Sequence, residues 1–360
     1  MKKILFIINN LGIGGAERVF VDDANYLSSI GYDVTFVILY GDVKINPLLA
    51  ELKMSNDKIT LLKAKSIYDF HLYRKLYDIL KKNKNNIVYA TLNDAVFVSR
   101  TVCMFFLNVF LVTREANITN NKSLALKLAD ILMNFRVNVM VAVSEEVKKS
   151  ISFYQPWSAR KVKILHNGVD IPETSVKNLD NKVVLTVGSL TPKKAHTVLI
   201  DAFLVVIKEI TDAKLYIIGE GVLRKSLERQ IIEGGMKEHV FLLGEKKYKD
   251  VVEHYKTSSM FVLPSNQEGC PNVLLEAMSF GLPSVATDTD AVSEIIENGV
   301  SGIIVPTKNS GVLADNIIKV LNNADLRYRI GKNGKDRIVF FSKETHRLKL
   351  IKILINEEVV

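Results

Sequence analysis

The fold is decided by residues 264–283, which read PSNQEGCPNVLLEAMSFGLP. An apolar run, Met260 to Leu263, comes directly before this stretch and shows no alternation of polar and apolar residues. Such a run is typical of a strand that is buried on both faces of a parallel sheet. Ligands bind where loops leave the carboxyl ends of these strands, so the loop after Leu263 is expected to line a binding site.

Two glutamates stand on either side of the point where this loop gives way to a helix. Glu268 lies in the loop, and Glu276 lies about one turn into the predicted helix, with seven residues between them. A carboxylate accepts hydrogen bonds from hydroxyl groups, and the start of a helix offers N–H groups and a positive dipole to an anion. One small site could therefore hold hydroxyls and a phosphate together, as a nucleotide sugar requires.

Strand-like and helix-like runs alternate along the whole chain, which is the pattern of parallel α/β sheets. The pattern stops at a polar segment, residues 171–181, and restarts at Val183–Val187. The 360 residues also exceed the roughly 250–300 at which one hydrophobic core stops growing. We therefore expect two doubly wound α/β domains, residues 1–170 and 171–342, and a terminal helix over residues 343–356.

The strands that we expect in the first half are short apolar runs. They are Ile4–Ile8, Val34–Leu39, Ile87–Tyr89, Val109–Val112, Val139–Val143 and Val162–Leu165. In the second half the corresponding runs are Val183–Val187, Leu215–Ile218, Val240–Leu242, Met260–Leu263, Ser284–Ala286 and Gly302–Val305.

The positive charge of the chain is concentrated in its first half. Residues 1–170 hold 23 lysines and arginines against 15 aspartates and glutamates, whereas residues 171–360 hold 25 against 24. A basic half suggests an anionic partner such as nucleic acid, a membrane surface or a lipid phosphate. A merely solvated basic surface explains the excess about equally well.

The remaining composition indicates a reduced protein without a membrane span. Cys103 and Cys270 fall in different predicted domains, so a disulfide is not expected and a reducing, cytoplasmic compartment fits. The start, MKKILFIINN, is better explained as the first strand than as a signal peptide, because its apolar run ends after five residues. The most apolar stretch, residues 95–113, falls short of the about 20 residues that span a bilayer comfortably.

Further motifs make the chain resemble a known family. Residues 268–288, EGCPNVLLEAMSFGLPSVATD, closely resemble the paired-glutamate signature of the retaining glycosyltransferases of family 4. Other landmarks of that family follow one another in the right order along most of the chain. They are GGAER at 14–18, NGVD at 167–170, VGSLTPKKAHTVLIDAF at 187–203, IIGEG at 217–221 and VFLLG at 240–244.

The resemblance implies an architecture and an activity. The architecture is GT-B, two Rossmann-like domains facing across a cleft, with the helix 343–356 packing back on the acceptor-side first domain. The activity is retaining transfer of a hexose or N-acetylhexosamine from a nucleotide sugar, by default a UDP-sugar. The acceptor would be a glycan or polyprenyl-diphosphate-linked glycan in the assembly of a cell-surface polysaccharide, such as lipopolysaccharide or capsule. The basic first half then fits peripheral contact with the anionic inner face of the cytoplasmic membrane, without a nucleic acid partner.

The resemblance also assigns roles to residues of the second domain. Glu276 matches the glutamate that holds the ribose hydroxyls, and Glu268 matches the one that contacts the donor sugar. Lys194 matches the catalytic lysine that stabilises the departing diphosphate, and only the alignment favours it over Lys193. Ser189 stands where the family often has an arginine, which leaves one fewer positive charge for the diphosphate. Further donor contacts are expected at Gly14, Gly15, Gly219, Gly269, Cys270, Pro271, Asn272 and Val273.

Two places depart from the family pattern. The loop TREANITN at 113–120 has no histidine near the reaction centre, and Arg114, Glu115 and Asn117 become candidates for acceptor or sugar contact. Asp290 and Ala291 replace a usual glycine pair, and Asp288-Thr289-Asp290 is better explained as a turn and helix cap than as a metal motif. The six histidines show no metal-ligand spacing, so neither a metal nor another cofactor is expected.

Two alternatives to a glycosyltransferase remain. A nucleotide-sugar epimerase of the same architecture would need acid and base groups at the sugar, which the sequence does not obviously supply. A non-catalytic relative that still binds the nucleotide sugar would explain the departures at Ser189 and at Asp290-Ala291. Gly219 also has a second interpretation, because a tight strand-to-helix turn needs a glycine as much as a phosphate contact does.

Overall fold

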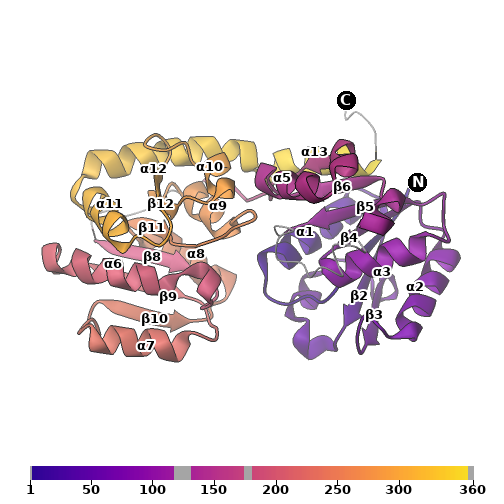
Figure 1. The fold of residues 1–360 in the computed structure, drawn as a ribbon, viewed down its shortest axis with the longest axis horizontal. Helices are drawn as coiled ribbons and strands as arrows, with labels where there is room; N and C mark the ends of the chain where they lie inside the picture. Colours follow the sequence, from indigo (N-terminus) through magenta and orange to yellow (C-terminus); the bar gives the residue numbers. More distant parts are fainter. Residues whose placement is uncertain (1, 117–130, 174–180, 356–360) are drawn as a thin grey trace. The chain divides into compact units, whose positions relative to one another are not determined.

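The computed structural model describes residues 2–116, 131–173 and 181–355, without the side chain of Asp290. The described chain divides into two units by its internal contacts. The first unit joins Met1–Gly168 to Glu344–Val360, and the second unit is Val169–Lys343. Figure 1 shows that each unit is a sheet with helices packed over it. Each is a parallel, doubly wound α/β fold, so the predicted fold class is confirmed.

The sheet of the first unit has seven parallel strands, and β1 lies near its middle. In spatial order they are β3 (Ile59–Ala64), β2 (Asp33–Tyr40), β1 (Lys3–Ile8), β4 (Ile87–Thr91), β5 (Phe110–Glu115), β6 (Val139–Ala142) and β7 (Val162–Ile164). The sequence analysis missed β3, an edge strand whose pairing with β2 slips by a residue near its end. Its residues are half-buried rather than apolar throughout, so no continuous hydrophobic run marks it.

Among the described residues, α-helices cover this sheet. They are α1 (Gly15–Ser29), α2 (Phe70–Asn83), α3 (Asn93–Cys103), α5 (Glu145–Tyr154) and α13 (Lys343–Ile355). Right-handed crossovers place α1 on one face of the sheet and α2, α3 and α5 on the other. Short 3-10 turns complete the unit: η1 (Val43–Ile45), η2 (Pro47–Glu51), η3 (Asn56–Lys58), η5 (Asn134–Arg136) and η6 (Pro156–Lys161).

A buried polar contact ties α13 to α1. The imidazole of His346 lies 2.7 Å from Oδ1 of Asp23 through Nε2 and 2.6 Å from the carbonyl oxygen of His166 through Nδ1. Leu350 and Leu354 of α13 join the same core as Phe20 of α1. The terminal helix is therefore held to the first unit by apolar packing and by the contacts of His346 with Asp23 and with the carbonyl of His166.

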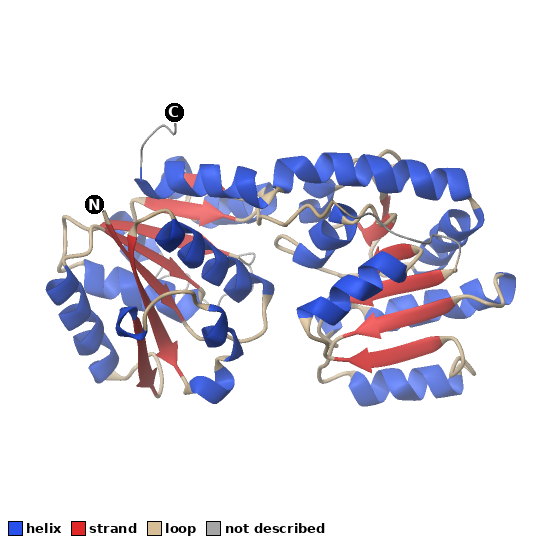
Figure 2. Ribbon diagram, turned by 180° about the vertical axis from the view of Figure 1, so that it is seen from behind, coloured by secondary structure: helices blue, strands red, loops and turns tan. Residues whose placement is uncertain are grey.

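The second unit contains six parallel strands. Figure 2 shows them as arrows pointing the same way, with helices packed over them. In spatial order they are β10 (Val240–Gly244), β9 (Lys214–Ile218), β8 (Val183–Val187), β11 (Met260–Leu263), β12 (Ser284–Thr287) and β13 (Ile303–Val305). The helical elements are η7 (Pro192–Lys194), α6 (His196–Glu209), α7 (Arg224–Glu233), α8 (Tyr248–Thr257), α9 (Asn272–Ser279), α10 (Asp290–Ile295), α11 (Ser310–Asn322), α12 (Ala324–Ile338) and η8 (Val339–Phe341).

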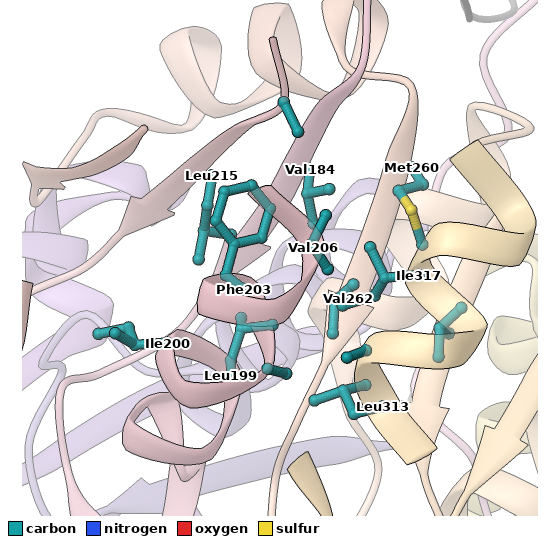
Figure 3. Close-up of a cluster of buried hydrophobic side chains, with 14 of the residues drawn as sticks. Val184, Leu199, Ile200, Phe203, Val206, Leu215, Met260, Val262, Leu313 and Ile317 are labelled. Carbon is teal, nitrogen blue, oxygen red and sulfur yellow. The ribbon is translucent and has the colours of Figure 1, made fainter. Parts of the chain in front are cut away.

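Strand β11 is buried on both faces, as its unbroken apolar run predicts. Met260 and Val262 belong to a core beneath α6 and α11, whereas Phe261 and Leu263 belong to a second core on the opposite face. Successive side chains of a strand point to opposite faces, so all four residues must be apolar. Figure 3 shows the first core, where Phe203 of α6 packs beside β8 and β9, and α11 packs beside β11.

Among the residues that the structure describes, no helix has both the length and the apolar character needed to cross a bilayer.

Candidate functional site

The carboxyl edge of the second sheet contains a topological switch point. Strands β8 and β11 are neighbours, but the chain continues from β8 to β9 on one side and from β11 to β12 on the other. Loops that leave such a pair of strands diverge and open a crevice, which is where ligands bind in open α/β sheets. The loop after β8 contains Ser189 and Lys194, and the loop after β11 contains Glu268.

Backbone contacts hold the two loops against each other. The amide of Asn266 donates to the carbonyl of Lys193 at 2.9 Å, and its side-chain nitrogen donates to the carbonyl of Pro192 at 3.2 Å. The hydroxyl of Thr287, at the end of β12, donates to the carbonyls of Leu263 and Ser265. The spacing of the two loops is therefore fixed by the protein itself.

The two residues predicted to be catalytic are in direct contact. The amine of Lys194 lies 2.5 Å from Oε1 of Glu268, and the hydroxyl of Ser265 donates to the same oxygen at 2.5 Å. Glu268 is buried and Lys194 is mostly buried, and the aliphatic part of the lysine lies against Gly188. A partly buried ion pair is less screened by water than a surface pair, so it fixes both side chains firmly.

The second predicted glutamate, Glu276, accepts a hydrogen bond from a buried tyrosine. The hydroxyl of Tyr255, on α8, donates to Oε2 of Glu276 at 3.0 Å. Tyr255 is fully buried and stacks on Phe280 with ring centroids 5.7 Å apart. Burial first, and the nearby carboxylate second, raise the pKa of Tyr255 well above its usual range, so the hydroxyl stays protonated as a donor.

Sequence reasoning missed Tyr255 and Ser265. Tyr255 lies on the buried face of an amphipathic helix, where an aromatic residue is ordinarily a core residue, so the sequence carries no signal for its contact with Glu276. Ser265 did carry a signal, because a hydroxyl three residues before a loop carboxylate can donate to it.

The turn before α9 and the first residues of this helix contain five of the predicted donor contacts. Helix α9 begins at Asn272 and has Pro271 as its N-cap, without a capping bond from a side chain. Gly269 and Cys270 lie in the turn that precedes it, and Val273 lies in its first turn. Glu276 is the fifth residue of the helix, so the loop carboxylate and the helix carboxylate flank the N-terminus of α9.

Gly219 is required by the close packing of two turns. Its φ is +143°, and a Cβ at this position would lie 2.0 Å from the carbonyl oxygen of Gly188. The amide of Gly188 donates to Ile218, and that of Leu190 donates to Glu220, at 2.9 and 2.8 Å. The hydroxyl of Ser189 lies 3.5 Å from that of Thr191 in the same turn. The turns after β8 and β9 are thus interlocked through their backbones.

A histidine at the start of α6 adds an uncharged group beside Lys194. His196 is buried, and burial first and the positive charge of Lys194 second lower its pKa to about 4. Within the described part of the chain its Nδ1 atom has no hydrogen-bond partner. His196 is therefore neutral at pH 7, and the cationic group at this point of the loop is the lysine.

In the first unit, Gly14 and Gly15 lie at the corresponding switch point, after β1. Gly14 is the N-cap of α1 and Gly15 is its first residue, and no side chain caps the helix. The carboxylate of Glu17 lies against Gly14, where a Cβ would meet its Oε2 at 2.1 Å. Burial raises the pKa of Glu17, while its own backbone amide and the nearby charge of Arg114 lower it.

Arg114 and Glu115 do not lie in a loop, so that part of the sequence analysis is wrong. Both are the last residues of β5, where Arg114 pairs with Val141 and Glu115 with Ala142 of β6. Arg114 is buried and donates to Oδ1 of Asn167, while its Nε and Nη1 atoms have no partner among the described residues.

Glu115 lies in a buried ion pair. Its carboxylate is 3.4 Å from the guanidinium of Arg100 on α3, and both side chains are almost fully buried. Asn117, the third candidate of this group, lies outside the described residues.

No metal site is formed by the residues that the structure describes, since no group of three or more histidine, cysteine, aspartate or glutamate side chains gathers there. At Asp288-Thr289-Asp290 the chain turns into α10 with Thr289 as the N-cap, and the threonine side chain makes no capping bond. This structure agrees with the predicted turn and helix start. The carbonyl of Thr289, not its side chain, accepts the hydrogen bond from the amide of Val292.

Comparison with known families identifies the chain. A family model described as "Glycosyl transferases group 1" matches residues 170–337, and one described as "Glycosyltransferase Family 4" matches residues 13–173. The first match covers the unit with the Lys194–Glu268 pair, and the second covers the unit with Gly14 and Gly15. The chain belongs to family 4 of the glycosyltransferases.

Similar proteins extend over nearly the whole chain. An uncharacterized glycosyltransferase of Haemophilus influenzae is 27% identical and covers 93% of this chain and 95% of its own. The N-acetylgalactosamine-N,N'-diacetylbacillosaminyl-diphospho-undecaprenol 4-alpha-N-acetylgalactosaminyltransferase of Campylobacter jejuni is also 27% identical, with coverages of 95% and 96%. The crystal structure of Anabaena HepE in complex with UDP and glucose matches with a TM-score of 0.86 at 20% identity, over 99% of this chain and 100% of HepE. That likeness shows the fold, which is GT-B.

Proposed function

We propose that this chain is a retaining glycosyltransferase that moves a hexose or N-acetylhexosamine from a UDP-sugar to a glycan acceptor. The observation that carries the proposal is the Lys194–Glu268 contact at the switch point of the second sheet. It joins a cation suited to a diphosphate and a carboxylate suited to sugar hydroxyls in one place. The related fold of HepE, solved with UDP and glucose, supports UDP as the nucleotide.

The donor would lie along the carboxyl edge of the second sheet. Glu276, oriented by Tyr255, accepts hydrogen bonds from the ribose hydroxyls. The diphosphate lies near the start of α9, where the helix dipole and the amides of residues 269–273 favour an anion. Gly219 and Ser189 line the neighbouring turns, and Glu268 holds the hydroxyls of the sugar. Gly14 and Gly15 of the first unit would offer further amides to the phosphates.

Catalysis would depend on stabilising the leaving group. The bond between the anomeric carbon and the diphosphate oxygen breaks, and the acceptor oxygen bonds to that carbon on the same face. The proton of the acceptor hydroxyl passes to the departing diphosphate, so no protein carboxylate needs to attack the sugar. Lys194 exchanges its contact with Glu268 for the developing phosphate charge, which is electrostatic stabilisation at the atom where charge appears. Arg114, buried at the end of β5, would bind the acceptor or the sugar.

The acceptor that we propose is a polyprenyl-diphosphate-linked glycan of a cell-surface polysaccharide. The Campylobacter relative, whose name specifies a diphospho-undecaprenol acceptor, supports this choice. Such an acceptor sits in a membrane, and we infer that the enzyme acts in the cytoplasm in peripheral contact with the anionic inner face. Neither an epimerase nor a non-catalytic binding protein is favoured by the comparisons, because the matched families are glycosyltransferases.

A thermal-shift series tests the donor site first. The purified protein is heated with UDP, GDP, ADP and NAD, alongside Glu276→Ala. We expect UDP to raise the melting temperature of the wild type and not of the variant. Stabilisation by another nucleotide alone would overturn the choice of UDP, and stabilisation by NAD alone would overturn the whole interpretation of the site.

Turnover tests the reaction. With an unlabelled lipid-linked glycan and a radiolabelled UDP-sugar, the wild type should transfer label to the acceptor, and Glu268→Ala should not. Isomerised free nucleotide sugar in place of transfer would establish an epimerase. Nucleotide binding without any turnover, on a panel of UDP-sugars and acceptors, would establish a binding protein.

A further inference from the structure

Five large apolar side chains of the first unit are exposed to solvent near the amino ends of its strands. They belong to the segments that enter β5, β6 and β7, so they lie at the amino edge, opposite the edge that holds Gly14 and Arg114. Each is between 60 and 80% exposed, whereas large aromatic residues are usually mostly buried. They are Phe105, Leu107, Phe135, Phe153 and Trp157, and we call the region that they form the amino-edge surface.

Two cations, the buried Arg136 and the half-buried Lys161, hold the backbone of this surface together. The guanidinium of Arg136 donates to the carbonyls of Cys103, Phe106 and Val109, at 2.6–2.7 Å. These bonds join the segment before β5 to the segment before β6. The exposed rings Phe105 and Phe135 therefore project from a connected backbone.

A second cation joins the next segment. The amine of Lys161, in η6, donates to the carbonyls of Asn134, Phe135 and Val137, at 2.8–3.2 Å. This contact fixes the turn that carries Trp157 to the turn that carries Phe135. The turns that contain the exposed rings are thus connected to one another by hydrogen bonds, and this connection keeps the rings exposed.

Cations outnumber acids in the segments around these rings, although Asp78 is exposed next to Tyr77, whose ring packs against Phe105. Residues 79–93, 95–114, 131–144 and 147–169 contain no aspartate or glutamate. The same segments hold Lys81, Lys82 and Lys84, exposed just before β4, and Arg160 and Lys163, exposed beside β7. The nearest acidic pair on α5, Glu145 and Glu146, lies in its first turn and therefore toward the carboxyl edge.

We propose that the amino-edge surface binds an anionic bilayer, with Phe105, Phe135 and Trp157 inserted among the headgroups and the lysines and arginine at the lipid phosphates. Exposed aromatic rings surrounded by cations match the apolar and anionic layers of such an interface. A second copy of this chain would bring like charges together, which opposes pairing through the same surface. The inference deepens the membrane contact in the proposed function by naming the surface that makes it, and it rests on that proposal only for its biological setting.

The sheet geometry determines how far Gly14 and Arg114 would lie from the bilayer. Strand β4 has five residues, so the carboxyl edge lies roughly 17 Å from the amino edge of the same sheet. Binding through the amino-edge surface leaves Gly14 and Arg114 on the side of the sheet away from the lipid. An acceptor would then reach the enzyme with its glycan extended from the bilayer.

The chain carries its own probe for this proposal, since Trp157 is its single tryptophan. Vesicles of phosphatidylglycerol and phosphatidylcholine should shift its emission to the blue, and brominated lipid should quench it. Pure phosphatidylcholine should give neither change, and 0.5 M salt should reverse the binding. No emission change with anionic vesicles would overturn the proposal. A blue shift that appears with protein concentration alone, or with an oligonucleotide but not with vesicles, would equally overturn it.

Variants test the individual contributions. Replacing Lys81, Lys82 and Arg160 by glutamine should weaken partitioning into anionic vesicles by roughly 100-fold, at about fivefold per cation. Phe105→Ser with Phe135→Ser should also reduce partitioning while leaving Trp157 in place to report it.

The matched control is Phe70→Ser. Phe70 is 75% exposed but starts α2, at the opposite edge of the same unit, so its loss should leave partitioning unchanged. If Phe70→Ser weakens binding as much as the amino-edge variants do, the surface is misassigned. Because the assay contains no nucleotide sugar, a failure here leaves glycosyl transfer untouched, and a failure of transfer leaves vesicle binding measurable.

Discussion

The two units share an architecture but build their glycine turns differently. In the second unit, Gly219 packs against the carbonyl of Gly188, and a side chain there would strike backbone. In the first unit, Gly14 faces only the movable carboxylate of Glu17, and its φ of −121° suits any residue. The backbone packing of the second unit therefore requires a glycine at position 219, whereas that of the first unit does not require one at position 14. The contrast suggests that Gly14 leaves room for something outside the described chain, such as the phosphates of a donor.

The charged groups show the same contrast. Lys194 and Glu268 lie in an ion pair that Ser265 completes. Arg114 is buried at the end of β5 with two of its nitrogen atoms lacking a partner among the described residues. A buried charge with incomplete hydrogen bonding is costly to keep, so such a group is a candidate for function. The two charges at the switch point of the second unit are thus paired with each other, whereas Arg114 of the first unit keeps nitrogen atoms without a partner among the described residues.

Replacing Lys194 should produce the largest effect. Lys194→Ala removes the cation that we propose for the leaving diphosphate, and kcat should fall about 100- to 1,000-fold. The matched control is Lys193→Ala, which removes the adjacent lysine and should change kcat less than about threefold. Steady-state turnover with saturating donor measures both. Equal losses in the two variants would mean that Lys194 has no special role.

The two glycines test the comparison directly. Gly219→Ala should lower the free energy of unfolding by about 3 kcal/mol or more, because the new methyl group meets backbone at a positive φ. Gly14→Ala should cost about 1 kcal/mol or less, since only the Glu17 side chain has to move. Urea unfolding measures both, with Gly235→Ala as a control that combines a positive φ with open space.

Binding separates the roles of these glycines. If Gly14 leaves room for the donor phosphates, Gly14→Ala should raise KM for the nucleotide sugar despite its small effect on stability. A Gly14→Ala enzyme with unchanged KM, or one as unstable as Gly219→Ala, would contradict the proposed difference between the two glycines.

The pH dependence of stability tests the environment beside Lys194. His196 has a pKa of about 4 when folded and its ordinary value of 6.5 when unfolded, so the unfolded chain binds more protons between these values. The contribution of His196 to the free energy of unfolding should therefore be fully present above pH 6.5. It should be lost as the pH falls toward 4, by about 3 kcal/mol in all. His196→Gln should flatten this part of the profile in urea unfolding. An unchanged slope in the variant would show that other groups cause it.

How much of this could be predicted from the sequence depended on how continuous the apolar runs were. Strand β11 was predicted correctly because every residue of it must be apolar. Strand β5 was cut short because Arg114 and Glu115 end its apolar run, although both are paired with β6. Their charges are accommodated by Asn167 and Arg100, which are distant in the sequence. The Lys194–Glu268 contact joins two loops that only the topology brings together, so it was not predicted. The family resemblance, together with the residue pattern, led to the two residues.

The smallest effect that we predict concerns Tyr255. Tyr255→Phe keeps the ring on Phe280 and removes the hydroxyl that donates to Glu276. A hydrogen bond to a charged group contributes about 1.5–3 kcal/mol. Glu276 is only partly buried, so water replaces part of this bond when the hydroxyl is removed. We therefore expect KM for the donor to rise about fivefold with kcat nearly unchanged. In a Glu276→Ala background the same substitution should have no further effect on nucleotide affinity, which a double-mutant cycle by calorimetry would measure. If the two changes proved additive, Tyr255 would contribute only to the core, and Glu276 would bind the nucleotide without help from the tyrosine hydroxyl.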